Sequence, residues 1–250
     1  MLCVKAALRT NALSFSLRSS PPLRRFPSSV RMSSSAPTQI IEHVVLLKAK
    51  PSADPSAVAD MVRNLNGLAT LDSVLHISAG PVARCRSTAL TFTHLLHSRY
   101  RSKSDLVSYT DDPVHVSVVA NYVLPVVEDV MAVDWVADDF SGPVAVPPGS
   151  SLRLTVMKLK EEGVGKGELL GIVRGMKGKF DSIEQLTAGE NFSPGRSKGF
   201  SIASIAVVKD LESLGEQSDL VNEQKDKARE FLDGVVVLDY AVPASVPASL

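Results

Sequence analysis

The sequence predicts an α+β fold in which two tandem copies of a β-α-β-β-α-β unit pair within the chain as a pseudo-dimeric α/β barrel. Two observations predict this fold. Short motifs recur in the same order about 110 residues apart, and both copies show the same succession of strand and helix patterns. The length of 250 residues suits one large domain or two small ones.

Four motifs make up the internal repeat. Because they recur in one order at nearly constant spacing, chance is a poor explanation. The segment SGPVAVPPGS at 141–150 lies between the copies, and its Pro/Gly/Ser content indicates a linker. The pairs are LLKAK 46–50 with VMKLK 156–160, ISAG 77–80 with LTAG 186–189, SDLV 104–107 with SDLV 218–221, and AVDW 132–135 with VLDY 237–240.

The first copy opens with a strand and a helix. IIEHVVLLKAK is rich in β-branched residues, and the period of two puts Ile41, His43, Val45 and Leu47 on one face. Asp54-Pro55 then starts a helix, because aspartate is a favoured N-cap and proline suits the first helical position. Apolar residues follow at helical spacing at 58, 61, 62, 65 and 68.

Two strands, a helical region and a final strand complete the copy. VLHISAG and ALTFTHLLHS are the strands, the latter with Leu90, Phe92, His94 and Leu96 on one face. Ser102 and Asp105 have capping-box spacing and open a short helix, and Asp112-Pro113 opens another that runs to about Tyr122. EDVMAVDW ends the unit. The second copy has the same order, with helices around 164–177 and 217–232.

Such a ferredoxin-like unit forms a four-stranded antiparallel sheet with its helices on one face. The other face is apolar and must be covered, and the simplest cover is the sheet of the second copy. We therefore expect domains at 39–140 and 151–243, joined by the linker 141–150. The pairing takes place within the chain, and further homodimerisation stays open.

The two ends of the chain have the composition of targeting segments. Residues 1–38 are rich in arginine and serine and contain no acidic residue, as is typical of a transit peptide, although a plain disordered tail has the same composition. The tail 244–250 ends in Ala-Ser-Leu, which is similar to the peroxisomal SKL signal. We expect a peroxisomal protein, with the chloroplast, reached through the leader, or the cytosol as alternatives.

Charge, hydrophobicity and motif order argue against three classes of function or site. The 27 basic residues match the 27 acidic ones, which argues against a dedicated nucleic-acid-binding protein. No apolar run reaches the roughly 20 residues of a membrane span. The run GKGELLGIVRGMKGK lacks the order of a phosphate-binding loop, so a loosely packed helix is the favoured interpretation.

The motifs of the first copy resemble a known family. IEHVVLLK, FTH, RSKSDLVSY followed by PVH, and the closing VDW are similar to the stress-responsive dimeric α/β-barrel (Dabb) domain. The match is good over about 40–137, whereas over 151–241 it extends only to the order of strands and helices. The arrangement of leader, two copies and C-terminal small-Ser-Leu resembles tandem Dabb stress proteins of plants. The family includes stress proteins without settled chemistry and a polyketide cyclase that uses a histidine base and a nearby tyrosine.

The resemblance implies candidate site residues in the first copy. The cyclase's catalytic histidine falls on His115 and its tyrosine on Tyr109, while His43 and His94 take the places of the family's strand histidines. Asp112 departs from the pattern, since the cyclase has a histidine there, and it puts the same substrate in doubt. The resemblance also implies a magnesium ion on backbone carbonyls near the end of the first helix, at Asn66 and Ala69; no other cofactor is implied.

All five histidines lie in the first copy. The repeat offsets place Arg153 opposite His43, Ser204 opposite His94, Glu223 opposite Tyr109 and Arg229 opposite His115. A site retained in one copy only would explain this asymmetry, and so would a first copy that is simply better preserved.

Three functions stay open. The leading one is a stress-response protein that binds a small apolar ligand in a first-copy cavity lined by His43, His94 and Phe92. The second is a cyclase-like enzyme with His115 as base and Tyr109 as hydrogen-bond donor. The third is a structural stress protein. Asp112 is expected to cap its helix, and His97 to lie on the surface.

Overall fold

The computed structural model describes residues 39–87, 90–138, 140–161, 163–212 and 219–244, and these residues belong to one compact unit. The leader 1–38 and the terminal Ala-Ser-Leu lie outside the described residues, so both targeting hypotheses stay predictions. Among the described helices, none is long and apolar enough to cross a membrane.

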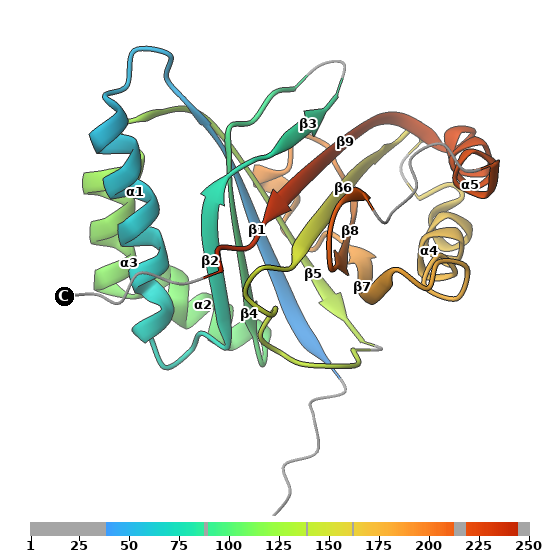
Figure 1. Cartoon of the computed structure of the whole chain (residues 1–250), viewed down its shortest axis with the longest axis horizontal. Helices are drawn as coiled ribbons and strands as arrows, with labels where there is room; N and C mark the ends of the chain where they lie inside the picture. The colour runs from blue at the N-terminus through green and yellow to red at the C-terminus, as the bar shows by residue number, and fades with distance from the viewer. Residues whose placement is uncertain (1–38, 88–89, 139, 162, 213–218, 245–250) are drawn as a thin grey trace, which may run out of the picture. The chain divides into compact units, whose positions relative to one another are not determined.

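The first copy forms an antiparallel four-stranded sheet in the order β2-β4-β1-β5, with its helices packed on one face (Figure 1). The predicted order of strands and helices is confirmed. The elements are β1 (Ile40–Ala49), α1 (Pro55–Gly67), η1 (Leu68–Thr70), β2 (His76–Pro81), β3 (Arg84–Arg86), β4 (His94–Tyr100), α2 (Lys103–Asp111), α3 (Pro113–Val118), η2 (Val119–Val123) and β5 (Val127–Ala137).

The second copy repeats the unit, and its sheet gains a strand from the first copy. The order is β3-β9-β6-β8-β7, so the short strand β3 crosses over and pairs antiparallel with β9. The remaining elements are β6 (Ser151–Leu159), α4 (Lys166–Arg174), β7 (Ile183–Glu190), η3 (Pro194–Arg196), β8 (Ile202–Val208), α5 (Asp219–Arg229) and β9 (Leu232–Ala241).

The helices of the first copy begin where the local sequence predicts. The Asp54 carboxylate accepts a hydrogen bond from the Ser56 amide at 2.8 Å, and the Ser102 hydroxyl accepts one from the Asp105 amide at 3.1 Å. Asp112 caps α3 in the same way, through the Val114 amide at 2.7 Å. Each cap satisfies a backbone donor that lacks a partner inside the helix.

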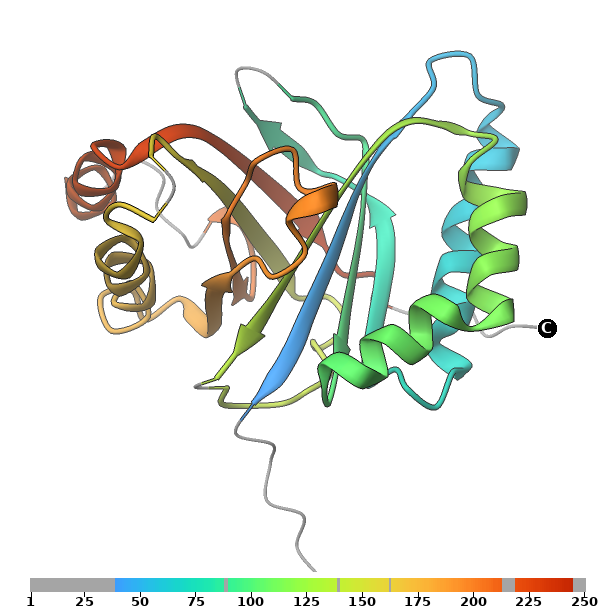
Figure 2. The same ribbon diagram turned by 180° about the vertical axis from the view of Figure 1, so that it is seen from behind.

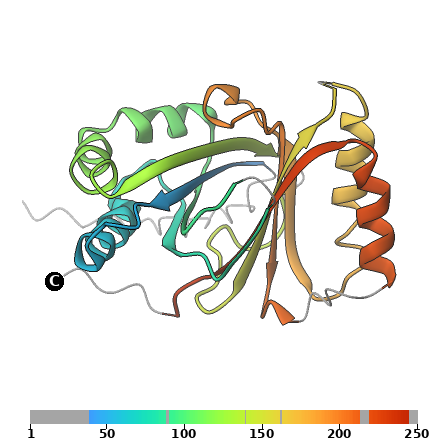
Figure 3. The same ribbon diagram turned by 90° about the horizontal axis from the view of Figure 1, so that it is seen from above.

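The two sheets face each other, and the helices lie on the outer sides (Figures 1 and 3). One continuous apolar cluster fills the space between the sheets; it includes Val44 and Leu46 of β1, Trp135 of β5, and Leu154 and Tyr240 of the second copy. The apolar sheet face predicted for each copy is therefore covered by the other copy, and the pseudo-dimeric barrel is confirmed.

Contacts between strand edges close the barrel on both sides (Figure 2). On one side β5 lies beside β7, where the Phe192 amide donates to the Asp134 carbonyl at 2.9 Å. Gly189 is required there, because a Cβ atom would lie 2.8 Å from the Trp135 ring. On the other side, beyond the β3–β9 pairing, the hydroxyls of Ser78 and Tyr240 are 2.6 Å apart.

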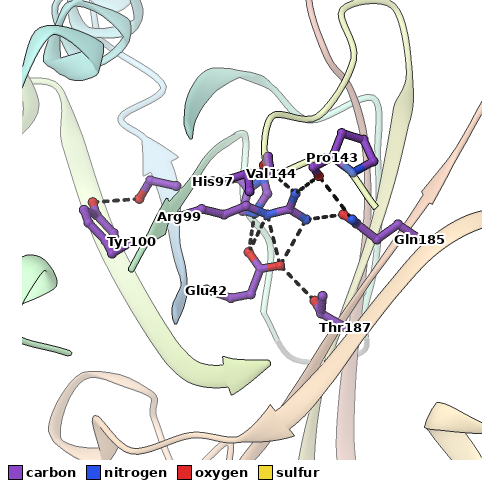
Figure 4. A network of polar contacts seen from close by, with 9 residues as sticks. Glu42, His97, Arg99, Tyr100, Pro143, Val144, Gln185 and Thr187 are labelled. Atoms are coloured by element: carbon purple, nitrogen blue, oxygen red, sulfur yellow. Dashed lines mark hydrogen bonds and ion pairs between the residues drawn. The ribbon is translucent and has the colours of Figure 1, made fainter. Parts of the chain in front are cut away.

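A buried polar network joins the sheets at the centre of the barrel (Figure 4). Glu42, His97 and Arg99 are fully buried. The Glu42 carboxylate accepts hydrogen bonds from His97 Nε2 at 2.6 Å, from Arg99 Nε at 3.2 Å and from the Thr187 hydroxyl at 3.0 Å. Arg99 also donates to the Gln185 side chain at 2.6 Å. The network thus spans both copies.

Two details of the predicted β4 strand are wrong. His97, expected on the surface, belongs to the buried network, because the alternation of the strand turns it toward the second sheet. The strand begins at His94 rather than near Leu90, so Phe92 precedes it and packs into the cluster between the sheets. Phe92 and His94 therefore do not share a strand face.

The charges of the network respond to burial. Burial alone would raise the pKa of Glu42, but Arg99 and His97 outweigh it and lower that pKa to about 2. Burial lowers the pKa of His97, against the opposing effect of Glu42. Burial also lowers the pKa of His76, whose ring lies 5.2 Å from that of His97, to about 3.

These shifts predict loss of stability in acid. Between pH 6.5 and about 3 the unfolded chain binds a proton at His76 that the folded chain does not, so stability falls as the pH falls. At pH 4.5 the loss from this group is about 2–3 kcal/mol. The melting temperature, measured by calorimetry from pH 8 to 4, should fall less steeply for His76→Gln. Equal slopes for both proteins, with equal stability at pH 8, would contradict the assignment.

Candidate functional site

A row of polar and aromatic side chains lies between the first sheet and its helices. It begins with His43 on β1, which is paired in register with Asp134 on β5. The His43 Nδ1 atom donates to the Asp134 carboxylate, and both side chains are buried. Burial would raise the pKa of Asp134, but the bond with His43 lowers it, so the carboxylate stays ionised and orients the imidazole.

Two buried tyrosines continue the row. The rings of Tyr100 on β4 and Tyr109 on α2 each have their centres 6.2 Å from that of His43, and they are 5.2 Å from each other. The Tyr100 and Ser98 hydroxyls are 2.9 Å apart. Burial raises the pKa of both phenols, so both remain neutral hydroxyls.

The row ends at His115 on α3, the residue expected to act as a base. Its ring centre lies 4.4 Å from that of Tyr109. The Nδ1 atom donates to the Thr110 carbonyl at 3.0 Å, which leaves Nε2 as the acceptor of a neutral ring. Burial lowers the pKa of His115, which favours that neutral form near pH 7. Asp112 caps the helix, as expected, and does not orient this ring.

The structure brings only some of the predicted residues together. His43, Tyr109 and His115 share the row, whereas His94 lies at the other end of β4, half-buried, with Nδ1 2.9 Å from the Thr93 hydroxyl. Phe92 lies on the opposite side of the sheet, in the cluster between the two sheets. Neither His94 nor Phe92 contacts this row.

The predicted magnesium position has a structural explanation of its own. The Asn66 side chain joins α1 to β2, since its amide donates to the Ala79 carbonyl and accepts from the Ala79 amide, both at 2.9 Å. Ala69 is exposed in η1. Across the described residues, no group of three or more His, Cys, Asp or Glu side chains is arranged to hold a metal ion. The magnesium ion is expected on backbone carbonyls, so its binding at Asn66 and Ala69 stays a prediction.

A large cavity of about 510 Å³ lies in the second copy, between its sheet and helices α4 and α5. None of the residues predicted to line a cavity borders it. Its floor comes from β6, β8 and β9 and its roof from the two helices. Most of the wall is apolar, including Met157, Val173, Met176, Phe180, Ile183 and Leu232.

Smaller side chains leave this space open. Strand register places Ser204 where the first copy has Leu96, since Thr155 pairs with Ser204 as Val45 pairs with Leu96. By the same register Val208 replaces Tyr100. In the first copy one continuous apolar cluster fills the region, whereas in the second copy the buried apolar side chains form two separate clusters.

One edge of the cavity is basic. Arg153, which replaces His43, donates to the Asp239 carboxylate through Nε at 2.7 Å and Nη2 at 3.0 Å. Arg86 of β3 binds the same carboxylate from the first copy. Burial would raise the pKa of Asp239, but the two arginines outweigh it and lower that pKa. Asp134 and Asp239, at matching positions of the two closing strands, thus each bind a side chain of the neighbouring first strand, His43 and Arg153.

Sequence reasoning missed several parts of both sites. The repeat shows that Asp134 and Asp239 hold matching positions, but the pairing of Asp134 with His43 depends on the register of two distant strands. Tyr100, the last residue of β4, also belongs to the row. The offset that placed Ser204 opposite His94 is wrong, because β4 and β8 are in register with His94 opposite Ile202. This register is set by the pairing of β4 with β1 and of β8 with β6, which the linear repeat offset does not report.

Two alanine variants, at Tyr109 and at His115, should differ in how much they lower the free energy of unfolding. Tyr109 is 1% exposed, so Tyr109→Ala should lower the free energy of unfolding by about 3–5 kcal/mol. His115 is half-buried and makes one hydrogen bond to the backbone, so His115→Ala should cost about 1 kcal/mol or less. Urea unfolding measures both. A larger cost for His115→Ala than for Tyr109→Ala would show that His115, not Tyr109, is the core residue.

Comparison with known proteins gives the family. The model of the stress responsive A/B barrel domain, Dabb, matches residues 41–137 and 152–242. The chain is 52% identical over 233 residues to a stress-response A/B barrel domain-containing protein of Arabidopsis thaliana, with 91% of this chain and 88% of that protein covered. A second protein of this description from the same plant, DABB1, is 44% identical over 210 residues, with 83% of this chain and 99% of DABB1 covered.

The fold also matches solved structures. A candidate monooxygenase from Fusobacterium nucleatum has a TM-score of 0.56 at 13% identity, with 82% of this chain and 93% of that chain covered. At this identity the likeness concerns the fold alone. The two family matches together span most of the described residues, and the chain belongs to the stress responsive A/B barrel domain (Dabb) family.

Proposed function

We propose that this stress-response A/B barrel protein binds a small apolar molecule, and that the binding site is the cavity of the second copy. The observation that carries the proposal is the cavity of about 510 Å³ under α4 and α5, with its mainly apolar wall. Small-molecule sites typically have volumes of about 300–1,000 Å³ and walls of this kind.

The difference between the copies supports the same site. Empty apolar space in a core costs stability, because its lining loses contacts. The first copy avoids that cost with Leu96 and Tyr100, which are both buried in its single apolar cluster. The second copy has Ser204 and Val208 at these places. A bound molecule would restore the missing contacts, which makes the second copy a better candidate than the first-copy cavity predicted from the sequence.

Filling the cavity provides the test. Ser204→Leu places in the second copy the leucine that the first copy has at the matching position. The variant should weaken binding of an uncharged fluorescent probe, 1-aminoanthracene, about tenfold or more. The variant should also be more stable by about 1 kcal/mol, since it buries extra methylene groups without a ligand. Ser52→Leu, at an exposed position, is the control for added hydrophobicity. Equal probe binding by Ser204→Leu and the unmodified protein would exclude this cavity.

A second candidate function is acid-base catalysis at the row of the first copy. The specific observation in its favour is the neutral His115 ring, whose Nδ1 is committed to Thr110 while it packs against Tyr109. In an aldol-type cyclisation, Nε2 takes a proton from the carbon between two carbonyls. The resulting enolate carbon bonds to a carbonyl carbon further along the same molecule, and the imidazolium returns its proton to the new alkoxide.

This candidate predicts that the activity depends on His115 but not on the carboxylate of Asp112. With a linear polyketide thioester, the cyclised product should form faster than in buffer, and His115→Ala should lower the rate by about 10²–10⁴-fold. Asp112→Asn keeps an oxygen that can cap α3, so it should retain the activity. Mass spectrometry of the products measures the rates. Equal rates for His115→Ala and the unmodified protein would remove the enzyme hypothesis.

A further inference from the structure

We propose that the molecule bound in the second-copy cavity is an amphiphile with an apolar body and a carboxylate group. This inference rests on the proposed binding function and adds the chemical class of the ligand. It comes from the charge of the cavity wall and from one buried amide group that faces no protein partner among the described residues.

The charged side chains in the described part of the wall are mainly basic. Arg86 and Arg153 come from the sheet, and Lys225 and Arg229 come from α5, against a single acidic side chain, Asp233. Asp233 is paired with Lys158 at 2.9 Å, and Arg229 lies 3.4 Å from Asp226. Arg86 and Arg153 share the single carboxylate of Asp239, so the wall keeps an excess of positive charge. A concave wall with this balance attracts an anion, and arginine matches the planar geometry of a carboxylate.

Gln224 supplies the independent observation. It lies on α5, lines the cavity and is 3% exposed. Its Oε1 atom accepts a hydrogen bond from Lys179 at 2.7 Å, which fixes the orientation of the amide. The Nε2 atom is then left buried, with no hydrogen-bond partner among the described residues. A buried donor without a partner is destabilising, so the site favours a ligand that brings an acceptor oxygen.

The rest of the wall matches the other end of such a molecule. Met157, Met176, Phe180 and Leu232 form an apolar surface with no charge to neutralise. Methionine side chains adapt to molecules of differing shape, because they are unbranched and flexible. The cavity therefore combines a basic edge with an adaptable apolar interior, which is the arrangement that a fatty or aromatic acid requires.

The first copy lacks these features. His43 stands where the second copy has Arg153, and its Nδ1 atom is bonded to Asp134. Tyr100 and Tyr109 are buried in the first copy between the sheet and the helices. The basic edge thus lies at the sheet of the second copy, where β3 adds Arg86, and it coincides with the cavity.

Calorimetric titration of the full chain with matched ligands tests the proposal. The probes are the straight-chain acids of six, ten and fourteen carbons and the alcohols of the same lengths, at pH 7.5. We expect the best acid to bind about tenfold more tightly than its alcohol, the contribution of a charge-assisted hydrogen bond. Lys225→Gln should reduce this preference several-fold. Gln224→Leu should weaken both ligands but the acid more, because a hydrogen bond to a charged acceptor contributes more than one to a neutral hydroxyl. Lys227→Gln on the same helix is the control, since Lys227 pairs with Glu223 at 2.6 Å and lies outside the wall.

The outcomes separate the two proposals. Acids and alcohols that bind equally well would overturn the carboxylate inference and leave the binding function in place. The same holds if none of them binds while 1-aminoanthracene does. Failure of the acids, the alcohols and the uncharged probe together would overturn both. The preference for acids over alcohols could instead fall as much in Lys227→Gln as in Lys225→Gln. That result would attribute the preference to the general charge of α5, and the inference would be wrong.

Discussion

The burial of one carboxylate between two sheets is the constraint on which the rest of the structure depends. Glu42 has no access to water, so its charge must be balanced inside the barrel. Arg99 and His97 on the neighbouring strand provide that balance, and Thr187 of the second copy adds a hydrogen bond. Removing one member of such a buried pair typically lowers the free energy of unfolding by about 3–5 kcal/mol. Because the network joins residues of both copies, it fixes the position of one sheet against the other.

The same network anchors the connection between the copies. Arg99 donates to the Val144 carbonyl at 2.7 Å, and Gln185 donates to the Ser141 carbonyl at 2.7 Å. The segment predicted to be a linker is therefore bonded to the barrel through its backbone. With the centre secured in this way, the outer layers of the two copies are free to differ. One has a filled layer with a row of rings, and the other has an open cavity between its sheet and helices.

The predictable parts of the fold are those that local sequence determines. Asp54 and Asp112 cap their helices because the residue type and the following proline suffice, and the short segment between Tyr109 and His115 brings their rings together. His97 was misplaced because its charged neighbours in sequence suggested a surface, whereas strand alternation decides which way it points. The pairing of His43 with Asp134 depends on register between distant strands. The cavity depends on missing volume at Ser204, which no periodicity in the sequence reports.

The crossing of β3 has a consequence for how the molecule is made. This strand belongs by sequence to the first copy but completes the second sheet by pairing with β9, close to the end of the described chain. The pairing joins residues that are far apart in sequence, so loop closure must precede it and it forms late. Until then β9 presents an unpaired edge, which is a template for association with other chains. A chain emerging from the ribosome therefore has its first copy complete but β3 unpaired, until β9 of the second copy has also been synthesised.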